Sequence, residues 1–363
     1  MESLLLHELH HELGAHFDER DGAEVVGHYG DVAAEHAALR QHAGVLDLSF
    51  RGRLCLTGTD RVRFLHGQVT NDVKKLRVGE GCYAALVTAK GKMESDLNIF
   101  CLQDELLLDF EPGLSLKVAQ RLEKFIVSDD VQIVEAAPHY GLLTVQGPKS
   151  DAVIRALGLF AELPAKALAS IKVSDATLGD IYLMNHARLG SAGFDLFVPN
   201  AALGAVADKL IAAAKAAGGR ACGWQAFDEA RIEAGIPRYG VDMNETILPL
   251  EAGLEARAVS YSKGCYIGQE VLNRIHSMGQ VAKELRGLRL LDSLVTLPQK
   301  GDRLFQDDKE VGYVTSAVRS RSFSQSLVLG YVRREINQPG AELTLRTTAG
   351  ECRVRVVALP FAL

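Results

Sequence analysis

SKGCYIGQEVLNRIH, residues 262–276, is the densest cluster of reactive and turn-forming residues in the chain. Gly264 and Gly268 bracket Cys265, so the backbone can turn tightly there and a ligand can approach without meeting a Cβ atom. From Gln269 onward, apolar residues recur at helical spacing, which predicts a helix. The thiol of Cys265 would then lie just before a helix N-terminus, where the helix dipole favours thiolate over thiol. The alternative interpretation is a small residue that fills a turn.

The segment from Lys263 to Glu270 carries a recognisable motif. The ammonium of Lys263, two residues from Cys265, would favour the thiolate further. The eight residues resemble the K-G-C-Y-x-G-Q-E signature of YgfZ folate-binding proteins, which are relatives of the glycine cleavage T-protein. This motif is far more specific than a two-residue redox pattern. The resemblance implies a multi-lobed, aminomethyltransferase-like folate-binding body, with tetrahydrofolate as the cofactor.

Two other stretches resemble T-proteins. Residues 35–73 match in order the opening of a T-protein and end in Thr-Asn-Asp-Val, which includes Asn71. Residues 231–253 resemble the pattern Arg-x-Glu-Ala-Gly, Pro, Tyr-Gly and Pro-x-Glu-Ala-Gly. The resemblance implies cofactor-binding residues, and these are Asn71, Asp195, Arg231 and Tyr239.

Asp195 and Arg231 have chemical support for this role. Asp195 follows Gly-Phe, where T-proteins have a glutamate that binds the pterin ring, and a carboxylate can accept two hydrogen bonds from a 2-amino-pyrimidine edge. The alternative is a solvent-facing carboxylate on an alternating strand. Arg231 stands where the family has an arginine that faces folate, and its guanidinium suits a carboxylate or a pteridine carbonyl. Its alternative is an exposed salt bridge to Glu229 or Glu233.

The resemblance fails at the expected reacting centre. T-proteins have an acidic pair a few residues after their glycines, and the corresponding run here, residues 91–97, contains Ser95 and Asp96. If the first position is the catalytic one, Ser95 replaces the acid, since a serine cannot hold the charge that steers attack on the folate-bound carbon. A second departure lies near the end of the next strand, where the family tends to have an asparagine and this chain has Asp109, Phe110 and Glu111. These departures argue against classical aminomethyl transfer.

Length and composition indicate an ordinary globular protein. The 363 residues can form two or three domains, and 47% hydrophobic and 24% charged residues are typical values. A net charge of −6 and a pI near 6.0 argue against a nucleic-acid partner. No apolar run approaches the roughly 18 to 20 residues of a membrane helix. The six cysteines form no C-x-x-C pair, which predicts no metal site and favours a reduced, cytoplasmic protein.

The order of the predicted elements indicates the fold class. Strands and helices alternate through residues 31–217, with a β-hairpin expected over residues 181–199, in a way that favours an α+β sandwich over a parallel sheet. Beyond residue 286 five short alternating strands punctuated by turns predict a small β-barrel. We therefore expect two interleaved α+β lobes over residues 1–280 and a C-terminal barrel over residues 281–363. The resemblance implies that the first of these is an aminomethyltransferase-like folate-binding region.

One further motif is an accidental match. His7-Glu8-Leu9-His10-His11 fits H-E-x-x-H, the helix pattern of zinc proteases. Such a site needs a third ligand and a helix buried in a cleft, whereas this match lies beside the chain start, where segments tend to fray. We therefore reject the protease interpretation.

Together these patterns predict a YgfZ-like tetrahydrofolate-binding protein that assists assembly or repair of iron–sulfur clusters, with Cys265 as the functional thiol supported by Lys263. Its partners would be folate and iron–sulfur client or assembly proteins. The iron–sulfur role is implied by the resemblance alone. One alternative is a folate-dependent aminomethyltransferase or methyltransferase that uses Asp96. Another is a binding module in which Cys265 is only structural.

Overall fold

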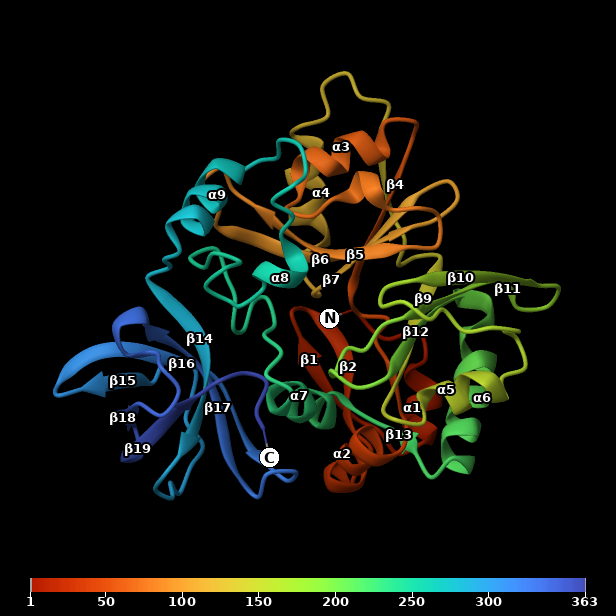
Figure 1. Ribbon diagram of the computed structural model, residues 1–363. Coiled ribbons are helices and arrows are strands. Elements are labelled where there is room, and N and C mark those ends of the chain that lie inside the picture. The colour runs from red at the N-terminus through yellow and green to blue at the C-terminus, as the bar shows by residue number, and fades with distance from the viewer. Residues whose placement is uncertain (1, 363) are drawn as a thin grey trace. The chain divides into compact units, whose positions relative to one another are not determined.

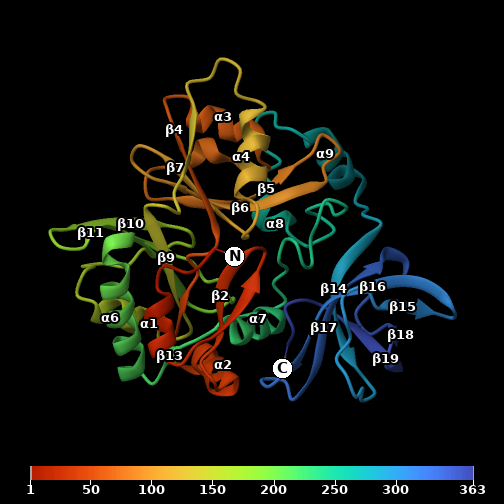
Figure 2. The same cartoon turned by 180° about the vertical axis from the view of Figure 1, so that it is seen from behind.

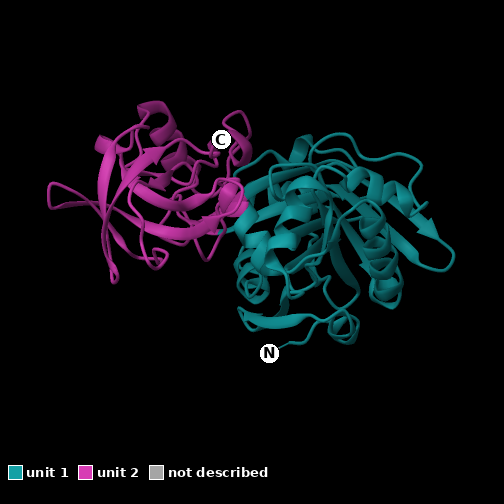
Figure 3. Cartoon of the chain, turned by 90° about the horizontal axis from the view of Figure 1, so that it is seen from below, with its two compact units in different colours: residues 1–84, 95–230 teal, residues 85–94, 231–363 magenta. Residues whose placement is uncertain are grey.

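The computed structural model describes residues 2–362. The chain forms two compact units, shown in Figure 3. Unit 1 contains residues 1–84 and 95–230, and unit 2 contains residues 85–94 and 231–363. The division expected between residues 280 and 281 stays a prediction, and the outermost positions, 1 and 363, lie outside the described residues.

A six-stranded sheet forms the larger core of unit 1, with the strand order β10-β11-β12-β9-β3-β13. Its pairs are antiparallel except for β13 with β3. Strand bounds are β3 Gly44–Asp47, β9 Tyr140–Gln146, β10 Ser170–Asp175, β11 Gly179–Asn185, β12 Gly193–Pro199 and β13 Arg220–Ala221. The β11–β12 pair confirms the hairpin predicted over residues 181–199.

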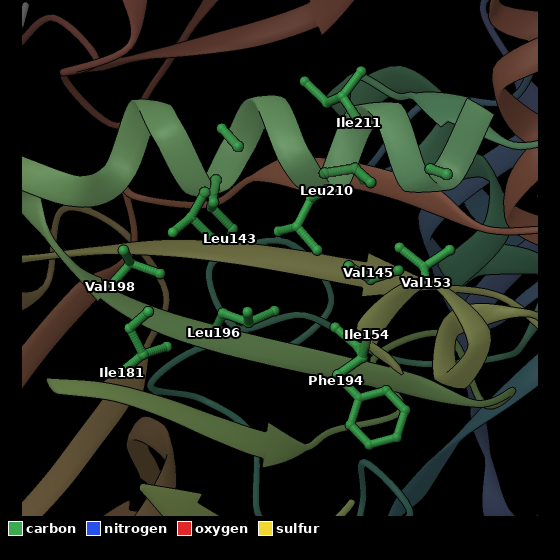
Figure 4. Packing of buried hydrophobic residues seen from close by; sticks show 14 of the residues in the cluster. Leu143, Val145, Val153, Ile154, Ile181, Phe194, Leu196, Val198, Leu210 and Ile211 are labelled. Carbon is green, nitrogen blue, oxygen red and sulfur yellow. The ribbon is translucent and has the colours of Figure 1, made fainter. Parts of the chain in front are cut away.

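Two helices, α5 (Ser150–Ala156) and α6 (Leu203–Ala216), cover one face of this sheet (Figures 2 and 4). The alanine-rich helix α6 places Leu210 against strands β9 and β12, which supply Leu143 and Leu196. These side chains are almost completely buried. Burial of a leucine side chain contributes about 1.5–3 kcal/mol, so this helix–sheet layer is a major source of stability.

A five-stranded sheet forms the second layer, with the order β5-β6-β7-β4-β8. Its strands are β4 Gly52–Thr57, β5 Gly81–Val87, β6 Met93–Cys101, β7 Leu106–Phe110 and β8 Gln132–Glu135. Helices α3 (Arg61–Gln68) and α4 (Ser115–Glu123) and the 3-10 turn η1 (Val73–Lys75) follow its strands. Phe100 and Leu107 share one core cluster with Leu142 and Phe197 of the six-stranded sheet. The two sheets therefore form the predicted sandwich.

Most of the remaining elements of unit 1 lie together in the lower middle of Figure 1, away from α3 and α4. The remaining elements are α1 (His7–Glu12), the paired strands β1 (His16–Arg20) and β2 (Ala23–His28), α2 (Val32–Gln41), the 3-10 turn η2 (Asn200–Ala202) and most of α7 (Trp224–Glu233). Trp224 and Phe227 of α7 pack into the core shared by the two sheets.

Unit 2 contains a closed barrel in the order β14-β17-β16-β15-β18-β19. Its strands are β14 Lys283–Leu290, β15 Arg303–Gln306, β16 Lys309–Ser320, β17 Gln325–Arg333, β18 Glu342–Thr347 and β19 Gly350–Val357. The barrel confirms the predicted fold class. Strand β15 was missed because its four residues lie between two turn signals, the second of which is Asp307–Asp308 with positive φ at both positions.

Two helices and a turn complete unit 2, namely α8 (Glu255–Ala258), α9 (Gln269–Met278) and η3 (Arg334–Ile336). Helix α9 begins where the sequence predicts, and Leu272 is its buried residue. Among residues 2–362, no helix is both long enough and apolar enough to cross a membrane.

Candidate functional site

Asp96 is a buried carboxylate on β6 with one unused oxygen. The hydroxyl of Tyr83, on the neighbouring strand β5, donates to Oδ2 of Asp96 at 2.7 Å. The other oxygen, Oδ1, is also buried, and it accepts no hydrogen bond from any residue between 2 and 362. Asn71 supports the same site, because its side-chain amide donates to the carbonyl oxygen of Tyr83 at 2.9 Å. Asn71 and Asp96, both predicted site residues, are therefore linked through Tyr83.

The electrostatic environment of Asp96 favours its protonated form. Burial raises the pKa of Asp96, and the negative charge of Glu111 raises it further, whereas the Tyr83 hydrogen bond lowers it. A buried polar atom without a partner costs free energy, and a catalytic role is one of the reasons for which folded proteins keep such an atom. A carboxyl group with a raised pKa and a free oxygen can exchange a proton with a bound ligand.

Ser95 does not take the place of this carboxylate. Successive side chains on a strand point to opposite faces of the sheet, so Ser95 and Asp96 face in opposite directions on β6. Ser95 is completely buried, and its hydroxyl donates to the carbonyl oxygen of Asp96 at 3.1 Å. Tyr83 therefore contacts Asp96 and not Ser95. Which of the two positions corresponds to the reacting acid of T-proteins stays a prediction.

Asp195 lies on β12 inside a network of buried charges. Its oxygens accept hydrogen bonds from Nε of Arg188 at 3.0 Å, and Nδ1 of His186 lies 2.7 Å from Oδ2. Arg188 also donates to Asp109 on β7 at 2.8 Å, and Arg51 contacts the same aspartate. The solvent-facing alternative for Asp195 is wrong, since the residue is 0% exposed. Its predicted contact with the pterin ring stays a prediction.

The charges in this network are strongly coupled. Burial alone would raise the pKa of Asp109, but Arg188 and Arg51 hold it far below its usual range. Burial likewise opposes ionisation of Asp195, yet Arg188 and then His186 lower its pKa. The carboxylates of Asp109 and Asp195 are therefore ionised at neutral pH and neutralise the two arginines.

Arg231 and Tyr239 lie in unit 2. Arg231 is 2% exposed, and it forms an ion pair with Asp242 and donates to the Ser316 hydroxyl at 2.9 Å. The alternative, an exposed salt bridge to Glu229 or Glu233, is wrong in its exposure, because the side chain of Arg231 is buried. Tyr239 is buried, and its hydroxyl lies 3.5 Å from the carbonyl oxygen of Met93. The folate contacts of both residues stay predictions.

The loop before α9 exposes the predicted thiol. Cys265 is the exposed one among the chain's cysteines, and Lys263 is buried with its ammonium 4.6 Å from the centre of the Tyr266 ring. Gly268 has φ +85°, and a Cβ atom there would lie 2.6 Å from the carbonyl oxygen of Thr88. The glycine of the motif is thus required both by backbone conformation and by close packing on the β5–β6 turn.

Comparison with known proteins identifies the family of this chain. The GCVT N-terminal domain matches residues 6–263, and the glycine cleavage T-protein C-terminal barrel domain matches residues 283–362. The chain belongs to the GCVT family. It is 29% identical to an aminomethyltransferase of Halalkalibacterium halodurans and 27% identical to one of Bacillus subtilis, and the alignments cover 98% of this chain and 96% and 98% of the relatives.

A solved GCVT-family structure has the same fold. The crystal structure of the glycine cleavage system aminomethyltransferase T from Bartonella henselae superimposes with a TM-score of 0.90 at 25% identity. The alignment covers 99% of this chain and 98% of that one. The similarity therefore extends over both the sandwich and the barrel.

Two other features of this GCVT-family chain lie apart from the predicted residues. A cavity of about 580 Å³ in unit 1 is bordered by Phe50, Arg53 and Tyr140, and neither Asp96 nor Asp195 lines it. In the H-E-x-x-H segment on α1, His7 hydrogen-bonds Glu24 at 2.9 Å. His10 in the same segment is buried between Asp47 and Tyr29. These contacts give both histidines a structural role in unit 1.

Tyr83, His186 and Arg188 were not predicted from the sequence. Tyr83 stands on β5, and its partner lies on the neighbouring strand of the same hairpin. The pairing of these two strands brings the side chains together, and the sequence does not give the register of that pairing. Arg188 donates a hydrogen bond to Asp109, which is 79 residues away in the chain, and no local sequence pattern predicts such a contact.

Proposed function

We propose that this GCVT-family chain binds tetrahydrofolate and performs folate-dependent transfer of a one-carbon unit of the aminomethyl type, with Asp96 as the reacting carboxyl group. Tetrahydrofolate is the one-carbon carrier of the family. The observation that carries the proposal is the buried carboxyl of Asp96, whose Oδ1 has no partner among residues 2–362. The curated relatives that share almost the full length are named aminomethyltransferases.

Asp96 and its neighbours suit this chemistry. When bound, tetrahydrofolate supplies the nitrogen that accepts the one-carbon unit. The free Oδ1 of Asp96 can take a proton or a hydrogen bond from that region, and Tyr83 holds the carboxyl group in place through Oδ2. Asn71 fixes the backbone of Tyr83. We assign Asp195, Arg231 and Tyr239 to binding of the cofactor, with Arg231 oriented by Asp242.

A direct assay tests the proposal. Purified protein is incubated with tetrahydrofolate and an aminomethylated carrier protein, and methylenetetrahydrofolate is measured. We expect turnover by wild type, a loss of about 10²–10⁴-fold in Asp96→Asn, and nearly full activity in Ser95→Ala. Ser95→Ala is the matched control because that side chain faces away from the site. Absence of turnover by wild type, or loss of turnover in Ser95→Ala alone, would contradict the proposal.

A second candidate function is support of iron–sulfur cluster assembly or repair. The observation that favours it is the exposed thiol of Cys265 within the K-G-C-Y-x-G-Q-E motif. A cluster usually takes four ligands, so one thiol would share a cluster with a client or assembly protein. Cells that lack the protein are complemented with wild type or Cys265→Ser, and the activity of iron–sulfur enzymes is measured. Equal complementation by Cys265→Ser would contradict this function.

A further inference from the structure

The cavity of about 580 Å³ in unit 1 lies apart from the residues proposed for one-carbon transfer. Its wall is formed by residues 2–5, 21–24, 49–53 and 135–141 and by the first residues of α4 and α6. Asp96, Asp195 and Tyr83 do not line it. Sites for small organic molecules typically enclose about 300–1,000 Å³, so this cavity has the volume of a ligand site.

Arg53, on β4, is a buried cation in the cavity wall. It is 1% exposed, and its Nη1 and Nη2 donate to the carbonyl oxygens of Tyr140 and Ser49, each at 2.7 Å. Its Nε has no hydrogen-bond partner among residues 2–362, and Arg53 forms no ion pair with any of them. A buried charge is costly unless an opposite charge accompanies it, so Arg53 favours an anion in the adjoining cavity.

The guanidinium of Arg53 keeps its charge in this environment. Burial lowers the pKa of Arg53 to about 10, whereas the charges of Asp109 and Asp47 raise it. Arg53 is therefore protonated at neutral pH. Arg51 also borders the cavity, but Asp109 and Glu111 contact its guanidinium at 2.8 and 2.7 Å. Of these two cations, Arg53 is thus the one that no carboxylate contacts.

Two helices begin at the same cavity. Ser115 and Leu116 are the first residues of α4, Leu203 is the first residue of α6, and all three line the wall. Neither helix start has a side-chain cap. The N-terminus of a helix carries a partial positive charge and N–H groups without helical partners. Both helix starts therefore favour an anion in the cavity, as Arg53 does.

Other parts of the wall suit an apolar group. Phe50, Leu5 and Pro138 line the cavity, and Tyr140 adds a second aromatic side chain. Ligand sites commonly combine such an apolar lining with a few polar groups that orient the ligand. The lining therefore favours an anion that carries an apolar or aromatic body over a bare inorganic ion.

Acidic side chains at the cavity restrict the charge of this anion. Glu2, Asp21 and Glu135 line the wall and are exposed, so water and salt screen their charges. Glu24 also lines the wall, is buried and is hydrogen-bonded to His7 at 2.9 Å. Repulsion from these carboxylates grows with the charge of the ligand, so a monoanion is favoured over a dianion such as a phosphate ester.

We propose that this cavity binds a small organic monocarboxylate, with its carboxylate group beside Arg53 and the starts of α4 and α6 and its apolar body beside Phe50 and Tyr140. The site is separate from the residues assigned to tetrahydrofolate and adds a second ligand to the chain.

Charge changes at the cavity test the site with little disturbance of the core. Ser115→Glu adds a carboxylate in the first turn of α4, where an acidic residue stabilises a helix. Gln120→Glu adds the same charge at an exposed position of the same helix, outside the cavity wall, and serves as the control. Glu135→Gln removes a carboxylate from the wall and keeps the shape of the side chain. Arg53→Met removes the buried cation, and thermal unfolding shows whether this variant folds.

The experiment is a calorimetric titration of each full-length protein with naphthoate and with its neutral analogue naphthamide. Wild type should bind naphthoate about 10-fold or more tightly, because a hydrogen bond to a charged group contributes at least this factor. Ser115→Glu should weaken naphthoate binding about 5-fold, Glu135→Gln should strengthen it about 3-fold, and Gln120→Glu should change it less than about 2-fold. Folded Arg53→Met should lose the preference for the anion.

Opposite effects of Ser115→Glu and Glu135→Gln would not arise from a merely structural role. Absence of naphthoate binding by wild type, equal binding of naphthoate and naphthamide, or equal effects of Ser115→Glu and Gln120→Glu would overturn the inference. Saturating tetrahydrofolate should leave naphthoate binding unchanged, and competition would show that the two ligands share one site and would also overturn it. The transfer assay is independent of these titrations, so the inference and the proposed function can fail separately.

Discussion

The hydroxyl of Tyr83 donates to Oδ2 of Asp96 at 2.7 Å, whereas Oδ1 of the same carboxyl group accepts nothing from the described residues. The hydrogen bond therefore holds the carboxyl group through Oδ2, while Oδ1 can still accept a hydrogen bond from a ligand. The fold thus bears the cost of burying an ionisable group that it does not fully satisfy, as expected for a group kept for function.

Replacement of Asp96 by asparagine should stabilise the protein while it removes transfer activity. Because the pKa of Asp96 is raised in the folded protein, its ionised form destabilises folding above that pKa, and this penalty disappears below about pH 4, the unfolded pKa. Asp96→Asn should therefore raise the free energy of unfolding by about 1 kcal/mol at neutral pH. Urea denaturation at neutral and acidic pH measures this gain, which should shrink in acid. A gain that is independent of pH would exclude a contribution from ionisation.

Replacement of Arg231 by alanine should unfold unit 2 more readily. The substitution leaves the buried, ionised carboxylate of Asp242 without its cation, and breaking a buried pair costs about 3–5 kcal/mol. Chemical denaturation measures the loss, and Arg274→Ala on the exposed face of α9 should stay within about 0.5 kcal/mol of wild type. The double variant Asp242→Asn/Arg231→Met should lose less free energy of unfolding than the two single variants lose together. Full stability of Arg231→Ala would show that the pair contributes nothing.

Acid should destabilise unit 1 through Asp109 and Asp195. Both carboxylates have a folded pKa below the unfolded value, so their contribution is complete above about pH 4 and is lost as the pH falls toward the folded values. The melting temperature of wild type should fall steeply in this acid range. Asp109→Asn should lower stability at neutral pH, since Arg51 and Arg188 lose a partner, and should flatten the acid dependence. An unchanged slope would show that other groups govern acid unfolding.

Alkylation of the native protein should modify Cys265 first. It is the exposed cysteine, Cys82 is intermediate, and Cys55, Cys101, Cys222 and Cys352 are buried. A brief treatment with iodoacetamide, followed by peptide mass spectrometry, should label Cys265 at least about 10-fold faster than the buried thiols. Cys265→Ser should remove the fast phase and keep the melting temperature. Labelling of a buried cysteine at the same rate would show that the fold opens locally.

Local sequence patterns determined much of the fold. Turn residues and alternating strands predicted the hairpin of β11 and β12 and the C-terminal barrel, because strand periodicity and turn chemistry act over a few residues. The helix start at Gln269 followed from apolar spacing in the same way. Strand β15 was not predicted, because its four residues are too few to show the alternation of a strand.

The tertiary structure alone decided the roles of the site residues. The sequence named Asp195 and Arg231, but their partners Arg188 and Asp242 became known only when folding brought the side chains together. The sequence placed Ser95 at the expected acid position with Asp96 beside it, and only the pairing of β6 with β5 showed that Asp96 contacts Tyr83. Ion pairs and free lone pairs are properties of three-dimensional surroundings, and residues as distant as Arg188 and Asp109 leave no common local pattern in the chain.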